Sequence, residues 1–127
     1  YNHSMKKLLI LLFSILISFN SNAKWTKATE DLGDTYYFDY GSIKKNNGNI
    51  FVWMLIDQYK PDYSGNFSNK ILYEIDCNPP LKGRSLSIIG YSLPMAKGNP
   101  NSVDNATGLW NYANNESKKL LNKVCNR

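Results

Sequence analysis

Residues 50–56 read Ile-Phe-Val-Trp-Met-Leu-Ile, and every side chain in this stretch is apolar. Successive side chains of a β-strand point to opposite faces of the sheet, so the run places apolar groups on both faces. A strand of that kind lies in the middle of a sheet with both faces covered. The stretch therefore predicts a central strand that passes through the hydrophobic core.

The segments before and after this run are predicted to pair with it. Residues 36–40 alternate in the way typical of a strand with one buried face, and Asn47-Gly48 is a strong hairpin signal between the two runs. After a polar loop at residues 60–69, one strand face carries the side chains of Ile71, Tyr73, Ile75 and Cys77. Cys77 is therefore expected to point the same way as the apolar residues.

The remaining elements complete a predicted α+β fold. Further strands are expected at residues 25–28 and 84–91, and an extended loop, either functional or mobile, at residues 94–108. Residues 116–125 are predicted to form a closing helix capped by Asn114 or Asn115. The predicted architecture is an antiparallel β-sheet of about five or six strands with one C-terminal α-helix on a sheet face.

Two cysteines, Cys77 and Cys125, are present. In an exported chain they most simply form one disulfide, and two free thiols are the alternative. Cys125 belongs to the apolar stripe of the predicted helix, so a bridge to Cys77 would fasten that helix to the sheet. The bridge encloses a loop of roughly 50 residues, for which the chain-entropy description gives about 4 kcal/mol of stabilisation.

The N-terminal part has the three segments of a secretory signal peptide. Residues 1–4 precede the first methionine and are expected to lie upstream of the true start. Two lysines then precede an apolar run at residues 8–19, and small side chains lead up to Ala23. We therefore expect a signal peptide over residues 5–23 and a single domain over residues 24–127.

An uncleaved membrane anchor is the alternative reading of that apolar run. The run is well short of the roughly 20 apolar residues that a helix needs to cross the hydrocarbon core. A lipoprotein signal would place a cysteine at the cleavage point, and none lies near Ala23. The sequence therefore predicts an exported chain with no membrane segment after signal cleavage.

Charge and composition exclude several functions. The formal net charge is +5, and the predicted signal peptide carries two of the lysines. Basic residues are scattered rather than gathered on one face, so no nucleic-acid partner is expected. The one histidine, His3, precedes the predicted domain, which removes Ser-His and Cys-His nucleophiles. No metal site and no cofactor are expected. The remaining alternative is an enzyme that uses Tyr and Lys side chains or carboxylates, for which Asp39, Asp57, Glu74 and Asp76 are the candidates.

Four residues are candidates for partner binding. Lys118, Lys119 and Lys123 form the basic outer side of the predicted helix, although such a charge run is more often simply a solvated face. Trp110 follows the loop at residues 94–108 and is the best candidate for an exposed aromatic side chain. Packing of Trp110 beneath the helix is the alternative.

Eight motifs occur in order along the chain. They are residues 25–27 (Trp-Thr-Lys), 36–45 (Tyr-Tyr-Phe-Asp-Tyr-Gly-Ser-Ile-Lys-Lys), 52–57 (Val-Trp-Met-Leu-Ile-Asp), 72–77 (Leu-Tyr-Glu-Ile-Asp-Cys), 91–92 (Tyr-Ser), 94–95 (Pro-Met), 110–112 (Trp-Asn-Tyr) and 120–125 (Leu-Leu-Asn-Lys-Val-Cys). In this order the motifs resemble the surface-adhesin protein E family of Gram-negative bacteria. The resemblance implies an antiparallel sheet tied to a C-terminal helix by the paired cysteines, and adhesion to host matrix and serum proteins.

These observations lead to two hypotheses about function. The first is an exported, non-enzymatic binding domain whose partner is a host or envelope macromolecule. The second is a periplasmic protein that binds a small ligand or an envelope component, for which an apolar pocket with convergent polar groups would be the sign. Because the lipid-anchor cysteine is missing, the expected location is the periplasm rather than the cell surface or the medium. An unpaired edge strand could also support a homodimer.

Overall fold

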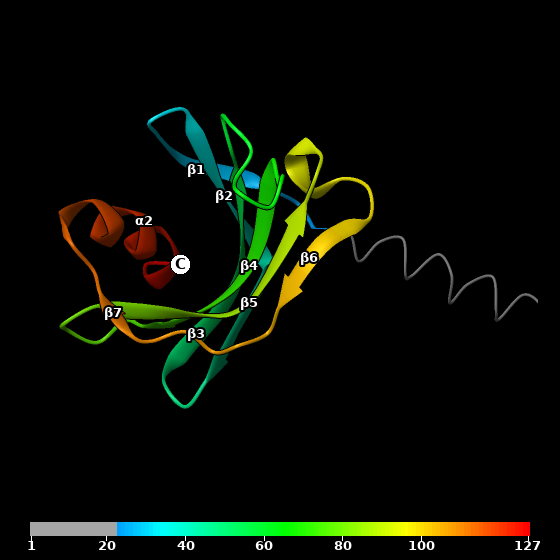
Figure 1. Ribbon diagram of the computed structural model, residues 1–127. Helices are drawn as coiled ribbons and strands as arrows, with labels where there is room; N and C mark the ends of the chain where they lie inside the picture. The colour runs from blue at the N-terminus through cyan, green and yellow to red at the C-terminus, as the bar shows by residue number, and fades with distance from the viewer. Residues whose placement is uncertain (1–22) are drawn as a thin grey trace, which may run out of the picture.

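The computed structural model describes residues 23–127, so residues 1–4 and the predicted signal peptide, apart from Ala23, lie outside the described residues. The described chain forms a curved sheet with a helix against one face (Figure 1). Its elements are β1 Thr26–Asp31, β2 Asp34–Asn46, β3 Asn49–Asp57, β4 Ser68–Asp76, β5 Lys82–Tyr91, the 3-10 helix η1 Pro94–Ala96, β6 Pro100–Asp104, β7 Asn111–Tyr112 and α2 Asn115–Cys125.

The strands β1 to β6 lie side by side in sequence order, each antiparallel to its neighbour. The two-residue strand β7 pairs with the first residues of β5, on the edge that β6 occupies further along. β3 lies between β2 and β4 in the middle of the sheet, with Trp53 directly between Asp39 and Leu72. The predicted antiparallel sheet with a C-terminal helix is therefore confirmed.

The turn between β2 and β3 is the predicted Asn47-Gly48 hairpin. Both residues adopt left-handed backbone angles, with φ of 53° and 83°. A two-residue turn of this kind matches the right-handed twist of its strands, and Asn-Gly tolerates it best. The hairpin sets the register that pairs Lys45 with Ile50 and so directs the apolar side chains of β3.

The core lies between α2 and one face of the sheet, which we call the inner face. Phe38, Val52 and Ile75 are fully buried there, and Leu121 and Val124 close the core from the helix side. On β3 the buried residues Ile50, Val52 and Met54 recur at every second position, and on α2 Leu121 and Val124 are three residues apart, which is the pattern that the sequence predicted.

Both ends of α2 are fixed. At its start, the side chain of Asn114 accepts a hydrogen bond of 2.9 Å from the backbone N–H of Ser117, which satisfies one of the free donors of the first turn. At its end, Cys125 forms the predicted disulfide with Cys77, the residue after β4. The disulfide ties α2 to the apolar side of the sheet, as expected.

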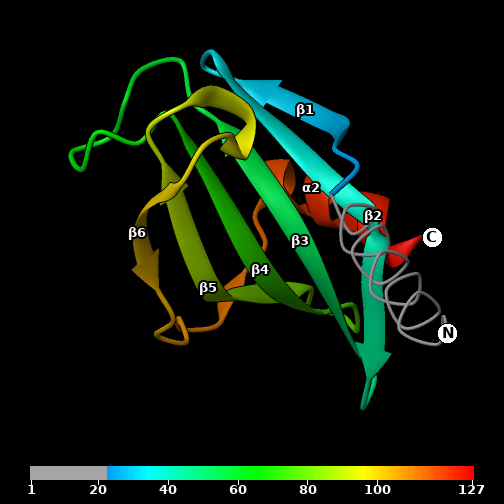
Figure 2. The ribbon, with the colours of Figure 1, turned by 90° about the vertical axis from the view of Figure 1, so that its right-hand side faces the viewer.

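The face of the sheet opposite α2, which we call the outer face, is only partly covered (Figure 2). The sequence predicted that both faces of β3 would be covered, and this is correct for Leu55 but not for the partly buried Trp53. The reason is that the segment around η1 crosses only one end of the sheet. There the hydroxyl of Ser68 donates a hydrogen bond of 2.6 Å to the carbonyl of Leu93.

The segment 94–108 is not the extended loop that was predicted. It contains η1 and then β6, which adds a strand to the sheet by pairing with β5. The side chains of β6 are all exposed, so the strand is held by backbone hydrogen bonds rather than by apolar burial. An edge strand of this kind carries no apolar alternation, and the sequence pattern therefore missed it.

Candidate functional site

Cationic and aromatic side chains meet on the outer face. The Nζ atom of Lys70 lies 4.9 Å from the ring centre of Trp53. Nearer the free edge, Lys82 Nζ and the guanidinium carbon of Arg84 lie 4.9 Å and 4.4 Å from the ring centre of Trp110. A cation over an aromatic face is attracted by the ring quadrupole, so these contacts hold flexible side chains in defined positions.

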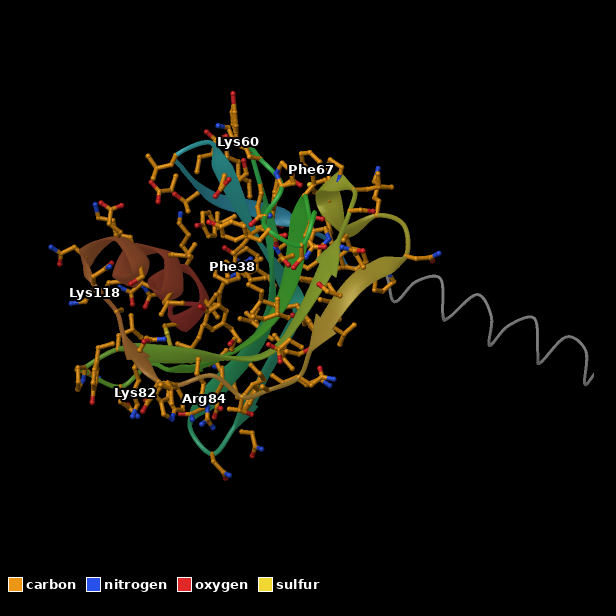
Figure 3. All side chains as sticks on the ribbon, viewed as in Figure 1. Phe38, Lys60, Phe67, Lys82, Arg84 and Lys118 are labelled. Atoms are coloured by element: carbon orange, nitrogen blue, oxygen red, sulfur yellow. A yellow bond between two sulfur atoms is a disulfide. The ribbon has the colours of Figure 1, made fainter. Side chains whose placement is uncertain are left out.

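Strand geometry explains why these residues meet. Lys82 is directly opposite Tyr112 in the ladder between β5 and β7, and Trp110 lies two residues before Tyr112. Alternate positions of a strand share one face, so Lys82, Arg84 and Trp110 project to the same side. Figure 3 shows Lys82 and Arg84 on the far side of β5 from Phe38 and α2.

An ion pair with the buried Glu74 fixes Arg84. Its Nε lies 2.8 Å from Oε1 of Glu74, a residue that is only 7% exposed and stands opposite Arg84 in the β4–β5 ladder. The other oxygen of Glu74 accepts a hydrogen bond of 2.9 Å from the side-chain amide of Asn49. With its carboxylate held on both oxygens, Glu74 orients the guanidinium that lies against Trp110.

Apolar side chains are exposed around Trp110. Leu109 precedes Trp110 and Tyr112 follows it by two residues, and they are 85% and 69% exposed. Trp110 itself is partly buried, and its contacts with Lys82 and Arg84 place it on the outer face and not beneath α2. We call Lys82, Arg84, Leu109, Trp110 and Tyr112 the Trp110 patch.

The other predicted partner residues lie elsewhere. Lys118, Lys119 and Lys123 are exposed on α2, on the side away from the core. Figure 3 places Lys118 across the sheet from Lys82 and Arg84. The structure therefore does not bring the helix lysines and Trp110 into one site.

A second feature lies on the inner face, between α2 and β1. It is a groove with a cavity volume of about 430 Å³, which we call the α2 groove. Its floor is apolar and its rim carries carboxylates. Its lining includes four apolar side chains, two tyrosines and three acids, namely Met54, Ile56, Leu120, Leu121, Tyr36, Tyr73, Glu30, Asp31 and Glu116.

Two tyrosines of the groove have raised pKa values. Burial raises the pKa of Tyr73 above its ordinary value. The pKa of Tyr36 is raised by burial first and then by the negative charges of Asp34 and Asp31 and by Tyr73. Both phenols therefore stay neutral at physiological pH and can donate or accept hydrogen bonds.

Sequence reasoning missed the α2 groove, although the two tyrosines carried a signal. Tyr36 and Tyr73 occupy the apolar faces of their strands, next to Phe38 and Ile75. A phenol hydroxyl in a dry core would lack a hydrogen-bond partner, so tyrosine at such a position indicates an opening to solvent or to a ligand.

The carboxylates that the sequence offered for an enzymatic role have structural partners. The carboxylate of Asp39 accepts a hydrogen bond from the backbone N–H two residues on, and that of Asp57 accepts one from the N–H of Met95. Glu74 is paired with Arg84. Within residues 23–127, no group of three or more His, Cys, Asp or Glu side chains is placed to hold a metal ion.

Fold and surface together define a class, a small disulfide-closed sheet domain with a helix on one face and an aromatic, cationic patch on the other. The chain matches the family described as surface-adhesin protein E over residues 25–126, and it belongs to that family. No curated protein and no solved structure matches it. In the part of the chain that the structure describes, no helix combines the length and hydrophobicity needed to cross a bilayer.

Proposed function

We propose that this chain is an exported, non-enzymatic binding domain that recognises an acidic macromolecule of the host or of the bacterial envelope through its outer face. The observation that carries the proposal is the grouping of cation–aromatic contacts, at Trp53 and Trp110, on the face that α2 leaves open. Membership of the surface-adhesin protein E family supports adhesion as the role.

The chemistry of the Trp110 patch suits a macromolecular partner. Tryptophan, tyrosine and arginine are the residues that most often dominate binding energy, because they bury large areas at a small cost in side-chain entropy. Arg84 and Lys82 are already positioned by Trp110 and Glu74, so little further ordering is needed on binding. Without the two lysines of the predicted signal peptide the formal net charge of +5 falls to +3, which still speeds the encounter with an acidic partner.

The helix lysines Lys118, Lys119 and Lys123 stay the second candidate surface. They supply exposed positive charge on long, flexible side chains. Charges of that kind raise the association rate more than the affinity. The proposal therefore assigns the main contact to the Trp110 patch and a steering role to the helix lysines.

We also propose that the mature chain is released into the periplasm. The proposal rests on the predicted signal peptide over residues 5–23 and on the absence of a cysteine near Ala23. Fractionation of cells that express the full chain should recover it in the soluble periplasmic fraction. Recovery only on the cell surface, by protease treatment or labelling of intact cells, would contradict the periplasmic location.

The binding proposal is tested with a panel of immobilised host extracellular-matrix proteins, serum proteins and acidic envelope polysaccharides, read by surface plasmon resonance. The purified protein should bind at least one member. Trp110→Ala should weaken that binding by tenfold or more, about the loss expected for a central anchor residue. Lys82→Ser should weaken it by a smaller factor.

The matched control is the double variant Lys118→Ser/Lys119→Ser, which removes two exposed charges from α2. It should lower the association rate and leave the dissociation rate close to that of the unsubstituted protein. A panel with no binding member would overturn the proposal. So would an intact response from Trp110→Ala together with a large loss from the helix variant.

A further inference from the structure

The α2 groove has the size and the lining of a small-molecule site. Its cavity volume of about 430 Å³ falls in the usual range for ligand pockets, roughly 300–1,000 Å³. The floor is formed by Met54 and Leu121, which are 3% and 7% exposed, with Ile56 and Leu120 beside them. An apolar body of one or two rings can therefore replace water against this floor.

Polar groups converge above the floor. Among the described residues, neither Tyr36 nor Tyr73 has its hydroxyl in a hydrogen bond, and burial is the first cause of the shift in both of their pKa values. Groups that are partly desolvated and lack a partner gain most from a ligand that supplies one. The two phenols thus offer hydrogen bonds to a bound molecule.

The negative charge of the rim favours a positively charged ligand. Glu30, Asp31 and Glu116 line the groove, and none of the lining residues is Lys or Arg. Lys27 offsets Glu30 through an ion pair, whereas within residues 23–127 Asp31 and Glu116 have no ion-pair partner. This negative rim contrasts with the net charge of +5 of the whole chain.

The N-terminus of α2, by contrast, favours an anionic ligand. The first turn of α2 lies at the groove, and a helix N-terminus carries about half a positive charge, which favours anions. The carboxylates of Asp31 and Glu116 together exceed that half charge, and Glu116 is itself part of the first turn. The negative charges of Asp34 and Asp31 also contribute to the raised pKa of Tyr36, which indicates a negative potential at its hydroxyl.

We propose that the α2 groove binds a small organic cation, with its apolar or aromatic body on Met54, Ile56 and Leu121 and its ammonium group directed at Asp31 and Glu116. The tyrosine hydroxyls hold the polar part of the same ligand. Tyr112 is the one residue of the Trp110 patch that also lines the groove. The charged and apolar residues that carry this proposal are not part of the patch, so the proposal stands independently of the macromolecular partner. It gives the small-ligand hypothesis a defined location.

Three probes that share one ring system test the sign of the charge. They are tryptamine, which is a cation, indole-3-ethanol, which is neutral, and indole-3-acetate, which is an anion. Isothermal titration of the purified protein should show saturable binding of tryptamine. Indole-3-ethanol should bind roughly five- to tenfold more weakly, as expected for one partly exposed ionic contact, and indole-3-acetate weaker still.

Charge-neutral variants test the location. Asp31→Asn/Glu116→Gln should bring the affinity for tryptamine down to that for indole-3-ethanol. The matched control Asp104→Asn removes an exposed acid from β6 and should bind tryptamine as the unsubstituted protein does. The melting temperature of each variant is measured alongside, so that a folding defect is recognised.

A steric variant provides a second test. Thr29→Trp places a large side chain at the β1 side of the groove and should abolish binding of all the probes in a protein that still melts cooperatively. Equal affinity for the three probes, no binding of tryptamine, or an equal loss in Asp104→Asn would overturn the proposal.

Discussion

At the scale of single residues, a polar network beneath the 58–67 loop shows how side-chain hydrogen bonds replace apolar packing. Asn66 is only 3% exposed, and its amide donates a hydrogen bond of 3.1 Å to Ser102 and accepts one of 2.8 Å from Asn101. The carboxylate of Asp62 accepts a hydrogen bond of 3.0 Å from the backbone N–H of Asn66. This network fastens the loop to β6, and no sequence pattern could have paired residues so far apart along the chain.

The lowered pKa of Asp62 predicts that its contribution to stability depends on pH. Burial acts to raise its pKa, but hydrogen bonds from Asn66, Asn69 and Ser64 outweigh burial and hold the pKa below the ordinary value. A lowered native pKa stabilises the fold above the unfolded-state pKa of about 3.9, and this contribution is lost as the pH falls through the native pKa.

Asp62→Asn should therefore be less stable than the unsubstituted protein by about 0.5–1 kcal/mol near neutral pH, a small figure because Asp62 is well solvated. The difference should shrink as the pH is lowered from about 5 towards 2. Urea unfolding at several pH values measures it. A difference that stays constant over this range would contradict the assigned role of the charge.

Close packing at Gly90 gives a second prediction. A methyl group there would overlap the Asn66 side chain and would lie 2.5 Å from Ser102 Oγ. Gly90→Ala should therefore cost about 1–3 kcal/mol in the free energy of unfolding, as overpacking does elsewhere. Gly41→Ala, where the nearest atom would lie at 3.4 Å, is the control and should change stability by no more than about 0.5 kcal/mol. Equal losses in the two variants would count against the packed network.

At the scale of elements, the parts of the fold that bury apolar side chains were predictable and the parts that do not were missed. The run at residues 50–56 predicted β3, the Asn47-Gly48 turn predicted its hairpin, and the apolar stripe ending at Cys125 predicted α2. β6 and η1 were not found, because their side chains are mostly exposed and hydrogen bonds rather than apolar burial hold them in place. Amphipathic periodicity detects elements that bury an apolar face, so an element without such a face cannot be predicted from it.

The attachment of α2 to the sheet gives a third prediction. Beyond its apolar stripe, α2 depends on the Cys77–Cys125 bridge, which constrains the unfolded chain. The double variant Cys77→Ala/Cys125→Ala should lose about 2–4 kcal/mol of stability. Reduction of the unsubstituted protein with dithiothreitol should give a loss of the same size. A melting temperature that neither change affects would contradict the structural role of the bridge.

At the scale of the whole molecule, the two faces of one sheet carry different chemistry. The inner face holds the core and, under α2, an acidic groove. The outer face carries cations stacked on Trp53 and Trp110. The sequence identified Trp110 and the helix lysines as separate features, but only the cross-strand register shows that Trp110 meets Lys82 and Arg84 rather than Lys118.

The central claim is that the outer face is the binding surface, and NMR tests it most directly. The chain has three tryptophans, so its indole N–H signals can be assigned by single substitutions. On addition of the panel member that the protein binds, the signals of Trp110 and Trp53 should shift or broaden, and the backbone amides of α2 should change little. Perturbation confined to the amides of Lys118, Lys119 and Lys123, with both indole signals unchanged, would contradict the claim.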